Sequence, residues 1–234
     1  MDRIIKITLA VFIILLAAFI AQGWYSHYVE QKYRSSLAST YTYTCTISTN
    51  EELTNVTFII PVPVTSSGDS QVSEHYSVRR IRGLPAEWTT TLLGSGKGTM
   101  IKITTPFLLP SSTNLELEVP VDGPIETRSL LENGILFRPI QNIKPLACPT
   151  SSGEVAACYE YASSIFATYD SSPQASVTIT TTIIGKNEWY IFSPESNQYS
   201  DTVAVTITGA HRRWIPATGE LLTGIGSHDA PEIS

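Results

Sequence analysis

The sequence predicts a mainly β protein, in which an antiparallel β-sandwich ectodomain follows one N-terminal transmembrane helix. Short segments of alternating apolar and polar residues recur at intervals of about ten residues, separated by Gly, Pro, Ser and Asn, which is typical of antiparallel sandwiches and barrels. No ten-residue amphipathic helix follows residues 24–39, and this argues against parallel α/β folds. The chain also begins with a long apolar run.

The apolar run extends over Ile4–Ala21, and Lys6 is the only charged residue in it. A helix of this length spans roughly 27 Å, close to the thickness of the hydrocarbon layer of a bilayer. Trp24, Tyr25 and Tyr28 follow, where an interfacial belt of aromatic residues is expected. We therefore expect the lipid bilayer as the partner of Ile4–Ala21, and a single-pass protein of the cell membrane with most of the chain extracytoplasmic.

Two other interpretations of the apolar run remain open. A secretory signal could be cleaved near Ala21-Gln22-Gly23, although the run is longer than a usual signal core. A buried core helix is the third alternative. The uncleaved anchor predicts this division of the chain: signal anchor 1–23, stem 24–39, β-sandwich ectodomain 40–225 and flexible tail 226–234.

Several features agree with export. Asn55-Val56-Thr57 is a glycosylation sequon, so we expect a glycoprotein modified at Asn55. Cys148 and Cys158 bracket a short loop, which predicts a local disulfide in an exported protein. Cys45 is interpreted as a buried free thiol, with pairing to one of the other two cysteines as the alternative. The net charge of -6 argues against nucleic acid as a partner.

The strand patterns predict which residues face inward. In TYTYTCTIST, Tyr41, Tyr43, Cys45 and Ile47 share one face of a strand. NVTFIIPVPV is apolar but contains two prolines, which predicts an edge strand or a bulge. The region 122–157 is rich in Pro and Gly and is expected to be irregular.

The segment GSGKGT at 94–99 invites comparison with a phosphate-binding loop. A P-loop needs Gly, four residues and Gly-Lys-Ser/Thr between a strand and a helix. Here Gly98 follows Lys97, Thr91 occupies the position of the first glycine, and the next residues alternate as a strand. The sequence therefore predicts a hairpin connection, whose glycines permit positive φ.

No other motif predicts catalysis, a cofactor or a metal site. Ser227, His228 and Asp229 are adjacent in the chain, whereas a catalytic triad needs side chains that converge from different segments. The turn region NEWYIFSPESNQYSD carries oxygen ligands suited to calcium, including Asp201, but its spacing matches no EF-hand. A polar hairpin explains these residues as well.

Two basic clusters form a candidate patch for an anion or a partner. They comprise Arg79, Arg80 and Arg82, and Arg212, Arg213 and Trp214. Such clusters could contact lipid headgroups, an acidic glycan or an acidic protein. The alternative is salt bridges on the outward positions of strands.

The C-terminal segment from NEWYIF to LLTGIG resembles a group of uncharacterised single-pass, membrane-anchored extracytoplasmic β proteins of archaea. The residues that carry the resemblance are Asn187, Glu188, Trp189, Gly209, Trp214, Gly219 and Glu220. The resemblance implies an extracytoplasmic β domain on one membrane helix. It implies no activity and no catalytic residues.

The sequence favours a membrane-anchored binding module or structural module of the cell envelope, with an envelope glycan or a protein as partner. Threonines and tyrosines on outward strand positions would suit such contacts. An accessory subunit of a membrane complex is the alternative, and an exported hydrolase is the third hypothesis. We do not expect an enzyme, because no nucleophile and base can be placed together from their spacing.

Overall fold

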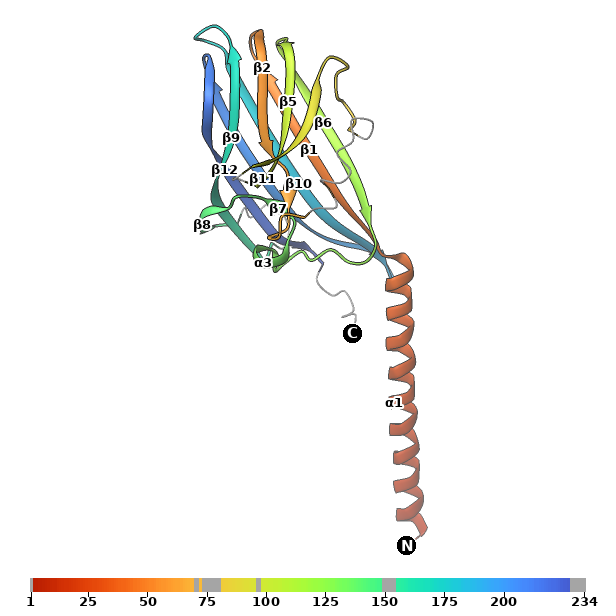
Figure 1. The fold of residues 1–234 in the computed structure, drawn as a ribbon. Helices are drawn as coiled ribbons and strands as arrows, with labels where there is room; N and C mark the ends of the chain where they lie inside the picture. The colour runs from red at the N-terminus through yellow and green to blue at the C-terminus, as the bar shows by residue number, and fades with distance from the viewer. Residues whose placement is uncertain (1, 70–71, 73–80, 96–97, 149–154, 228–234) are drawn as a thin grey trace.

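The computed structural model describes residues 2–69, 72, 81–95, 98–148 and 155–227. One helix, α1 (Asp2–Ser36), stands apart from a tall curled sheet, and the chain enters the sheet where the helix ends (Figure 1). Its segment Arg3–Ser36 is long and apolar enough to cross a membrane, and none of its most apolar stretch is buried against the sheet. Packing therefore gives no support to the interpretation of this segment as a core helix. The predicted stem is mostly helical, because α1 continues to Ser36.

The strands of the main sheet are all antiparallel. Their order is β4-β5-β2-β9-β12-β11-β10-β1-β6, and β8 also pairs with β9. Their bounds are β1 (Ala38–Thr49), β2 (Leu53–Pro61), β4 (Thr89–Ser95), β5 (Gly98–Leu108), β6 (Ser111–Val121), β8 (Gln141–Leu146), β9 (Ala157–Asp170), β10 (Ser176–Tyr190), β11 (Pro194–Thr208) and β12 (His211–Gly226). A second, two-stranded sheet joins β3 (Pro63–Val64) to β7 (Leu136–Phe137), and a short helix, α3 (Leu130–Asn133), precedes β7.

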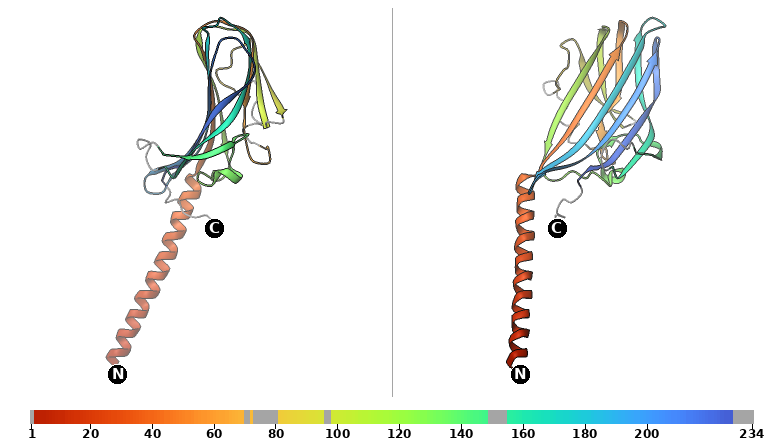
Figure 2. Two further views of the ribbon diagram at one scale, coloured as in Figure 1. Left: turned by 90° about the vertical axis from the view of Figure 1, so that its left-hand side faces the viewer. Right: turned by 180° about the vertical axis from the view of Figure 1, so that it is seen from behind.

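The main sheet curls into a half-barrel (Figure 2), so the expectation of a β-sandwich is replaced by one bent sheet. The predicted antiparallel β class is confirmed. The strand alternation correctly identifies the inner face: Tyr41, Tyr43, Cys45 and Ile47 of β1 are all buried. Alternation states that one face of a strand is covered, but it does not state what covers it. Here the cover is the curl of the sheet itself and the chain segment 122–140.

The segment 122–140, called the inner segment below, is less irregular than expected because it contains α3 and β7. Leu130, Leu136 and Phe137 are fully or almost fully buried in the same core as the inward residues of the sheet. Burial of large apolar side chains contributes about 1.5–3 kcal/mol each. The inner segment therefore takes the place that a second sheet would occupy in a sandwich.

The two prolines of NVTFIIPVPV do not mark an edge strand. β2 lies between β5 and β9, and Pro61 is its last residue, opposite Met100 of β5. Pro63 begins β3, which belongs to the small sheet. Both prolines thus lie where the chain leaves the main sheet. This position suits proline because it has no backbone N–H to donate to a neighbouring strand.

Candidate functional site

The buried polar side chains of β10 and β11 hold the inner segment inside the half-barrel. Asn187 is the first of them. Its Nδ2 donates a hydrogen bond to the Ile125 carbonyl, and its Oδ1 accepts one from the Ile125 N–H, both at 2.8 Å. The same amide accepts a hydrogen bond from Ser39 and donates one to Asn197. All four hydrogen-bonding positions of this side chain are therefore used.

Asp201 and Tyr199 hold the inner segment at its other end. Asp201 is fully buried, and its carboxylate accepts hydrogen bonds from the Phe137 N–H at 2.8 Å and from the Tyr161 hydroxyl at 2.7 Å. The Tyr199 hydroxyl donates to the Ile135 carbonyl at 2.6 Å. We call Asn187, Tyr199 and Asp201 the polar clamp. Its partners are backbone groups of the inner segment, which burial would otherwise leave without hydrogen bonds.

The environment of Asp201 opposes its ionisation. Burial raises the pKa of this carboxyl group to about 7, although the hydrogen bonds from Tyr161 and the Phe137 N–H, together with nearby Arg138, act to lower it. Burial also raises the pKa of Tyr161 above its ordinary value. The carboxyl group is thus shared between structural donors, and neither of its oxygens is free for a substrate.

Two glycines give the tyrosine rings of this region their space. Gly185 lies opposite Tyr199, and Gly219 lies opposite Tyr161, in the registers of neighbouring strands. A Cβ atom at either glycine would overlap the facing ring. These rings therefore lie flat against a backbone that has no side chain, which brings their hydroxyl groups to the inner segment or to Asp201.

The acidic side chains of the turn region that carries Asp201 do not converge on one point. Asp201 points into the core, whereas the Glu188 side chain is exposed and pairs with Lys186. The described residues contain no group of three or more His, Cys, Asp or Glu residues arranged to hold a metal ion. The polar-hairpin interpretation of this region agrees with the observed β10–β11 pairing.

The basic clusters lie on separate parts of the sheet. Arg82 pairs with Glu118 at the β6 edge, and Arg212 pairs with Asp170 of β9 at 2.8 Å. Strands β11, β10 and β1 lie between β12 and β6. Arg79 and Arg80 fall outside the described residues. The members of the predicted patch that the structure describes are thus not joined into one surface, and salt bridges account for Arg82 and Arg212.

Arg213 and Trp214 continue β12 beyond Arg212. The Arg213 Nε donates to His211 at 3.3 Å, and the Trp214 ring packs edge-on against Phe166, with the ring centroids 5.6 Å apart. Alternate residues of a strand point to opposite faces, so Arg212 and Arg213 do not form one cationic surface.

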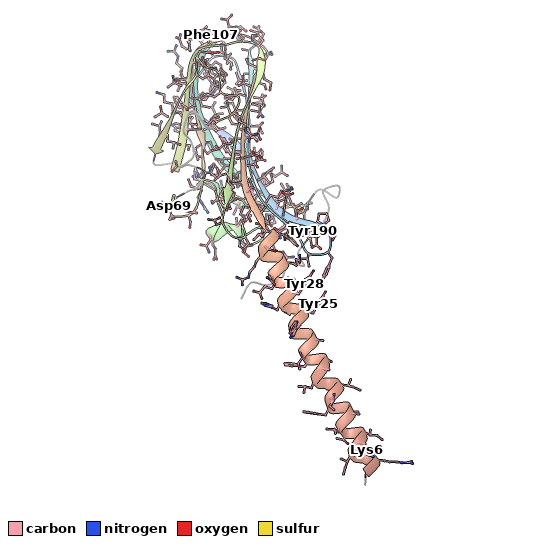
Figure 3. The ribbon with its side chains drawn as sticks, turned by 90° about the vertical axis from the view of Figure 1, so that its right-hand side faces the viewer. Lys6, Tyr25, Tyr28, Asp69, Phe107 and Tyr190 are labelled. Atoms are coloured by element: carbon pink, nitrogen blue, oxygen red, sulfur yellow. A yellow bond between two sulfur atoms is a disulfide. The ribbon has the colours of Figure 1, made fainter. Side chains whose placement is uncertain are left out.

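The glycosylation sequon lies near the end of the sheet that is farthest from α1. Thr54 pairs with Phe107, which Figure 3 places at that end, and Asn55 is the next residue and is exposed. The Asn55 amide donates to Asp170 at 2.9 Å. This hydrogen bond and the one from Arg212 lower the pKa of Asp170. Glycosylation at Asn55 stays a prediction.

The predicted disulfide is present between Cys148 and Cys158, which join the end of β8 to β9. Cys45 is buried and free, as its alternation in β1 suggested. Burial raises the pKa of the Cys45 thiol to about 12, which keeps it protonated and unreactive at neutral pH.

The segment GSGKGT connects β4 to β5, and Ser95 pairs with Gly98, so the predicted hairpin is confirmed in its flanking strands. Gly96 and Lys97 lie outside the described residues. At the C-terminus β12 continues to Gly226, and His228 and Asp229 lie in the undescribed part of the predicted tail.

The outer face of the sheet carries a regular array of threonines, which we call the threonine face. Thr44, Thr182 and Thr202 lie side by side on β1, β10 and β11, and the hydroxyl groups of Thr182 and Thr202 are 3.0 Å apart. The array comprises Thr40, Thr42, Thr44, Thr46, Thr178, Thr180, Thr182, Thr202, Thr206 and Thr208. Sequence alternation suggested these outward threonines.

The expectation of outward tyrosines on the strands is largely wrong. Tyr161, Tyr169 and Tyr199 are buried on the inner face, as are Tyr41 and Tyr43, whose inward position the alternation in β1 had already indicated. They lie inside, where their large rings fill the half-barrel. The Tyr199 hydroxyl donates to the Ile135 carbonyl of the inner segment, and the Tyr161 hydroxyl donates to Asp201.

A cluster of exposed aromatic residues marks the junction of helix and sheet. We call Trp24, Tyr25, Tyr28, Tyr190 and Phe192 the aromatic collar; each is exposed. Tyr25 of α1 stacks on Phe192 of the β10–β11 turn, with ring centroids 6.3 Å apart and an angle of 11° between the planes. The sequence showed the three helix residues but not the contribution of the turn, which is distant in the chain.

One cleft on the outer surface lies between β8, β9 and β12 and has a volume of about 280 Å³. Its described lining includes Lys144, Glu160 and Thr218 but no Ser–His or Cys–His pair. Within the described residues this cleft thus offers no nucleophile with an adjacent base. Comparison of the chain with protein-family models, curated proteins and solved structures gave no match, so the resemblance to archaeal membrane-anchored proteins stays a prediction.

Proposed function

We propose that the protein is a single-pass membrane protein whose half-barrel is held on the extracytoplasmic side, where it acts as a binding module or structural module of the cell envelope. The observation that carries this proposal is α1, a long apolar helix whose membrane-length stretch has no protein surface against it. Burial of such a helix in lipid removes an exposed apolar surface that water would disfavour.

The C-terminal end of α1, where it meets the sheet, supports an anchor that is rigidly joined to the domain. Leu37 alone separates α1 from β1. The Ser36 hydroxyl accepts a hydrogen bond from the Tyr190 N–H at 2.9 Å, and Tyr33 packs edge-on against Trp189 with both rings buried. A helix joined in this way holds the half-barrel at a defined position above the bilayer.

Export is supported by the disulfide between Cys148 and Cys158, because such bonds persist in oxidising compartments. The sequon at Asn55 is exposed at the end of the sheet far from α1, where a glycosylating enzyme could reach it. Within this proposal the threonine face is the contact surface, since its hydroxyl groups can both donate and accept hydrogen bonds to a glycan or a protein.

The location is tested by adding protease to intact cells that express the protein with a C-terminal tag. The proposal expects loss of the tagged domain and retention of a fragment that resists alkaline carbonate extraction. Protection of the domain in intact cells, with cleavage only after lysis, would place it in the cytoplasm and overturn the proposal.

The contact surface is tested by purification in mild detergent with bound envelope components. Thr182→Lys places a charge at the centre of the threonine face, and Thr104→Lys on β5 is the matched control on another part of the outer surface. We expect co-purifying material to be lost with the first variant and kept with the second. Retention with both variants would exclude the threonine face and favour an accessory subunit that meets its complex elsewhere.

A further inference from the structure

We infer that the β10–β11 turn is a second membrane contact, and that Phe192 at its tip rests in the headgroup layer of the bilayer beside the anchor helix. This inference rests on the proposed membrane anchor. It means that the half-barrel contacts lipid as well as α1.

The composition of the turn is the first argument. Turns between strands usually carry Gly, Asn, Asp or Ser, whereas this one has Ile191 and Phe192 between Tyr190 and Ser193. The Phe192 side chain is 62% exposed and that of Tyr190 is 55% exposed. An exposed phenyl ring in such a position is costly in water, but it is favoured where it can enter the boundary between lipid headgroups and acyl chains.

The level of the turn along α1 is the second argument. Phe192 stacks on Tyr25, which lies four residues beyond Ala21, the end of the apolar run. At about 1.5 Å per residue this contact lies roughly 6 Å above the hydrocarbon layer. The headgroup layer is about 5–8 Å thick on each side of a bilayer. A helix that places Ala21 at the hydrocarbon boundary therefore brings Phe192 into the headgroup layer.

The rigidity of the junction is the third argument. Ser36 bonds the Tyr190 backbone in both directions, since its hydroxyl accepts from the N–H and lies 3.0 Å from the carbonyl oxygen. Tyr33 and Trp189 fix the same two elements through buried rings. Figure 3 shows Tyr190 at the base of the sheet, above Tyr28 and Tyr25 of the helix. The turn cannot move far from the helix while these contacts hold.

The charges around the collar are compatible with a zwitterionic surface. Lys32 lies over the Tyr28 ring at 5.9 Å from its centroid, Arg34 pairs with Glu30, and Lys186 pairs with Glu188. Both signs are present above the Tyr25 and Phe192 rings, on the side away from the apolar run. Two contacts, the helix and the turn, would also limit rotation of the half-barrel and so set the direction of the threonine face.

The inference is tested with the full-length protein in phosphatidylcholine vesicles. A nitroxide label is placed on Phe192→Cys, on Ile13→Cys within the apolar run and on Phe107→Cys at the far end of the sheet. The native cysteines should take no label, since Cys45 is buried and the other two form the disulfide. The measurement compares collision of each label with oxygen, which concentrates in lipid, and with a water-soluble nickel chelate.

We expect the ratio of oxygen to nickel collisions to be highest at 13, intermediate at 192 and lowest at 107, with a several-fold difference between 192 and 107. Equal values at 192 and 107, with a high value at 13, would overturn the turn contact and leave the anchor intact. A low value at 13 would overturn the proposed anchor itself. A label at 192 shielded from both reagents would indicate a protein partner on the collar and would also overturn the lipid contact.

Discussion

The two faces of β10 and β11 are built from the same strands but differ in how much each residue depends on one partner. On the inner face Asn187, Tyr199 and Asp201 each bond a particular backbone group of the inner segment. On the outer face the threonines bond one another or lie open to solvent. Tolerance to substitution is therefore set by how deeply a side chain is buried and by whether one particular group depends on its hydrogen bond. It is not set by which strand carries the residue.

Asn187→Ala should have the largest effect. It leaves the Ile125 N–H and carbonyl buried without partners, and each such group costs about 1–3 kcal/mol. We expect the free energy of unfolding, measured by urea denaturation in mild detergent, to fall by roughly 2–6 kcal/mol. The outer-face control is Asn114→Ala, which removes one exposed hydrogen bond from Thr46 and should cost under about 1 kcal/mol. Equal losses in both variants would remove the distinction between the faces.

Gly219→Ala should have the next largest effect, because its Cβ atom would overlap the buried Tyr161 ring. Overpacking of this kind costs about 1–3 kcal/mol and would displace the hydroxyl that bonds Asp201. Gly94→Ala in β4 is the matched control, since a Cβ atom there meets nothing within 4 Å. We expect a lowered melting temperature for the first variant alone; an unchanged value for Gly219→Ala would mean that the Tyr161 ring can shift freely.

Asp201→Asn should change how stability depends on pH. The folded-state pKa of Asp201 is about 7, above the ordinary value near 3.9, so the folded protein keeps a proton that the unfolded chain releases. The contribution of Asp201 to stability is therefore fully present below about pH 4 and is lost as the pH rises to about 7.

Asparagine does not titrate, so the difference in unfolding free energy between the native protein and Asp201→Asn should shift in favour of the variant between pH 4 and pH 7. Denaturation curves at several pH values in this window measure the difference. Parallel curves for the two proteins would show that Asp201 is not the titrating group.

Thr182→Val should have the smallest effect. The substitution keeps the branched shape and removes one hydroxyl contact with Thr202 on the partly exposed outer face. We expect the unfolding free energy to change by less than about 1 kcal/mol, because solvated positions of a sheet tolerate such exchanges. A loss as large as that of Gly219→Ala would show that the threonine face contributes to the core.

Much of the fold could be predicted from local patterns. The alternation in TYTYTCTIST correctly identified the buried residues of β1, and the short spacing of Cys148 and Cys158 correctly predicted their disulfide. The curl of the sheet could not be predicted, because it depends on which strands become neighbours. For example, β2 pairs with β9, although strands β3 to β8 lie between them in the sequence.

The candidate surfaces divide in the same way. The threonine face follows from alternation within single strands, and the helix part of the aromatic collar follows from its position after the apolar run. The contribution of Phe192 and the pairing of Arg212 with Asp170 depend on contacts between distant segments, so the sequence showed the residues but not their neighbours.

By itself, the sequence determined the apolar length of α1, the period of the strands and hence which side chains avoid water, since these properties involve only residues that are close in the chain. The tertiary structure decided that one curled sheet, and not two stacked sheets, would bury those side chains. It also decided that Asn187 and Asp201 would bond backbone groups 62 and 64 residues away. Such partners are selected by the need to satisfy every buried polar group at once, which is a property of the whole folded chain.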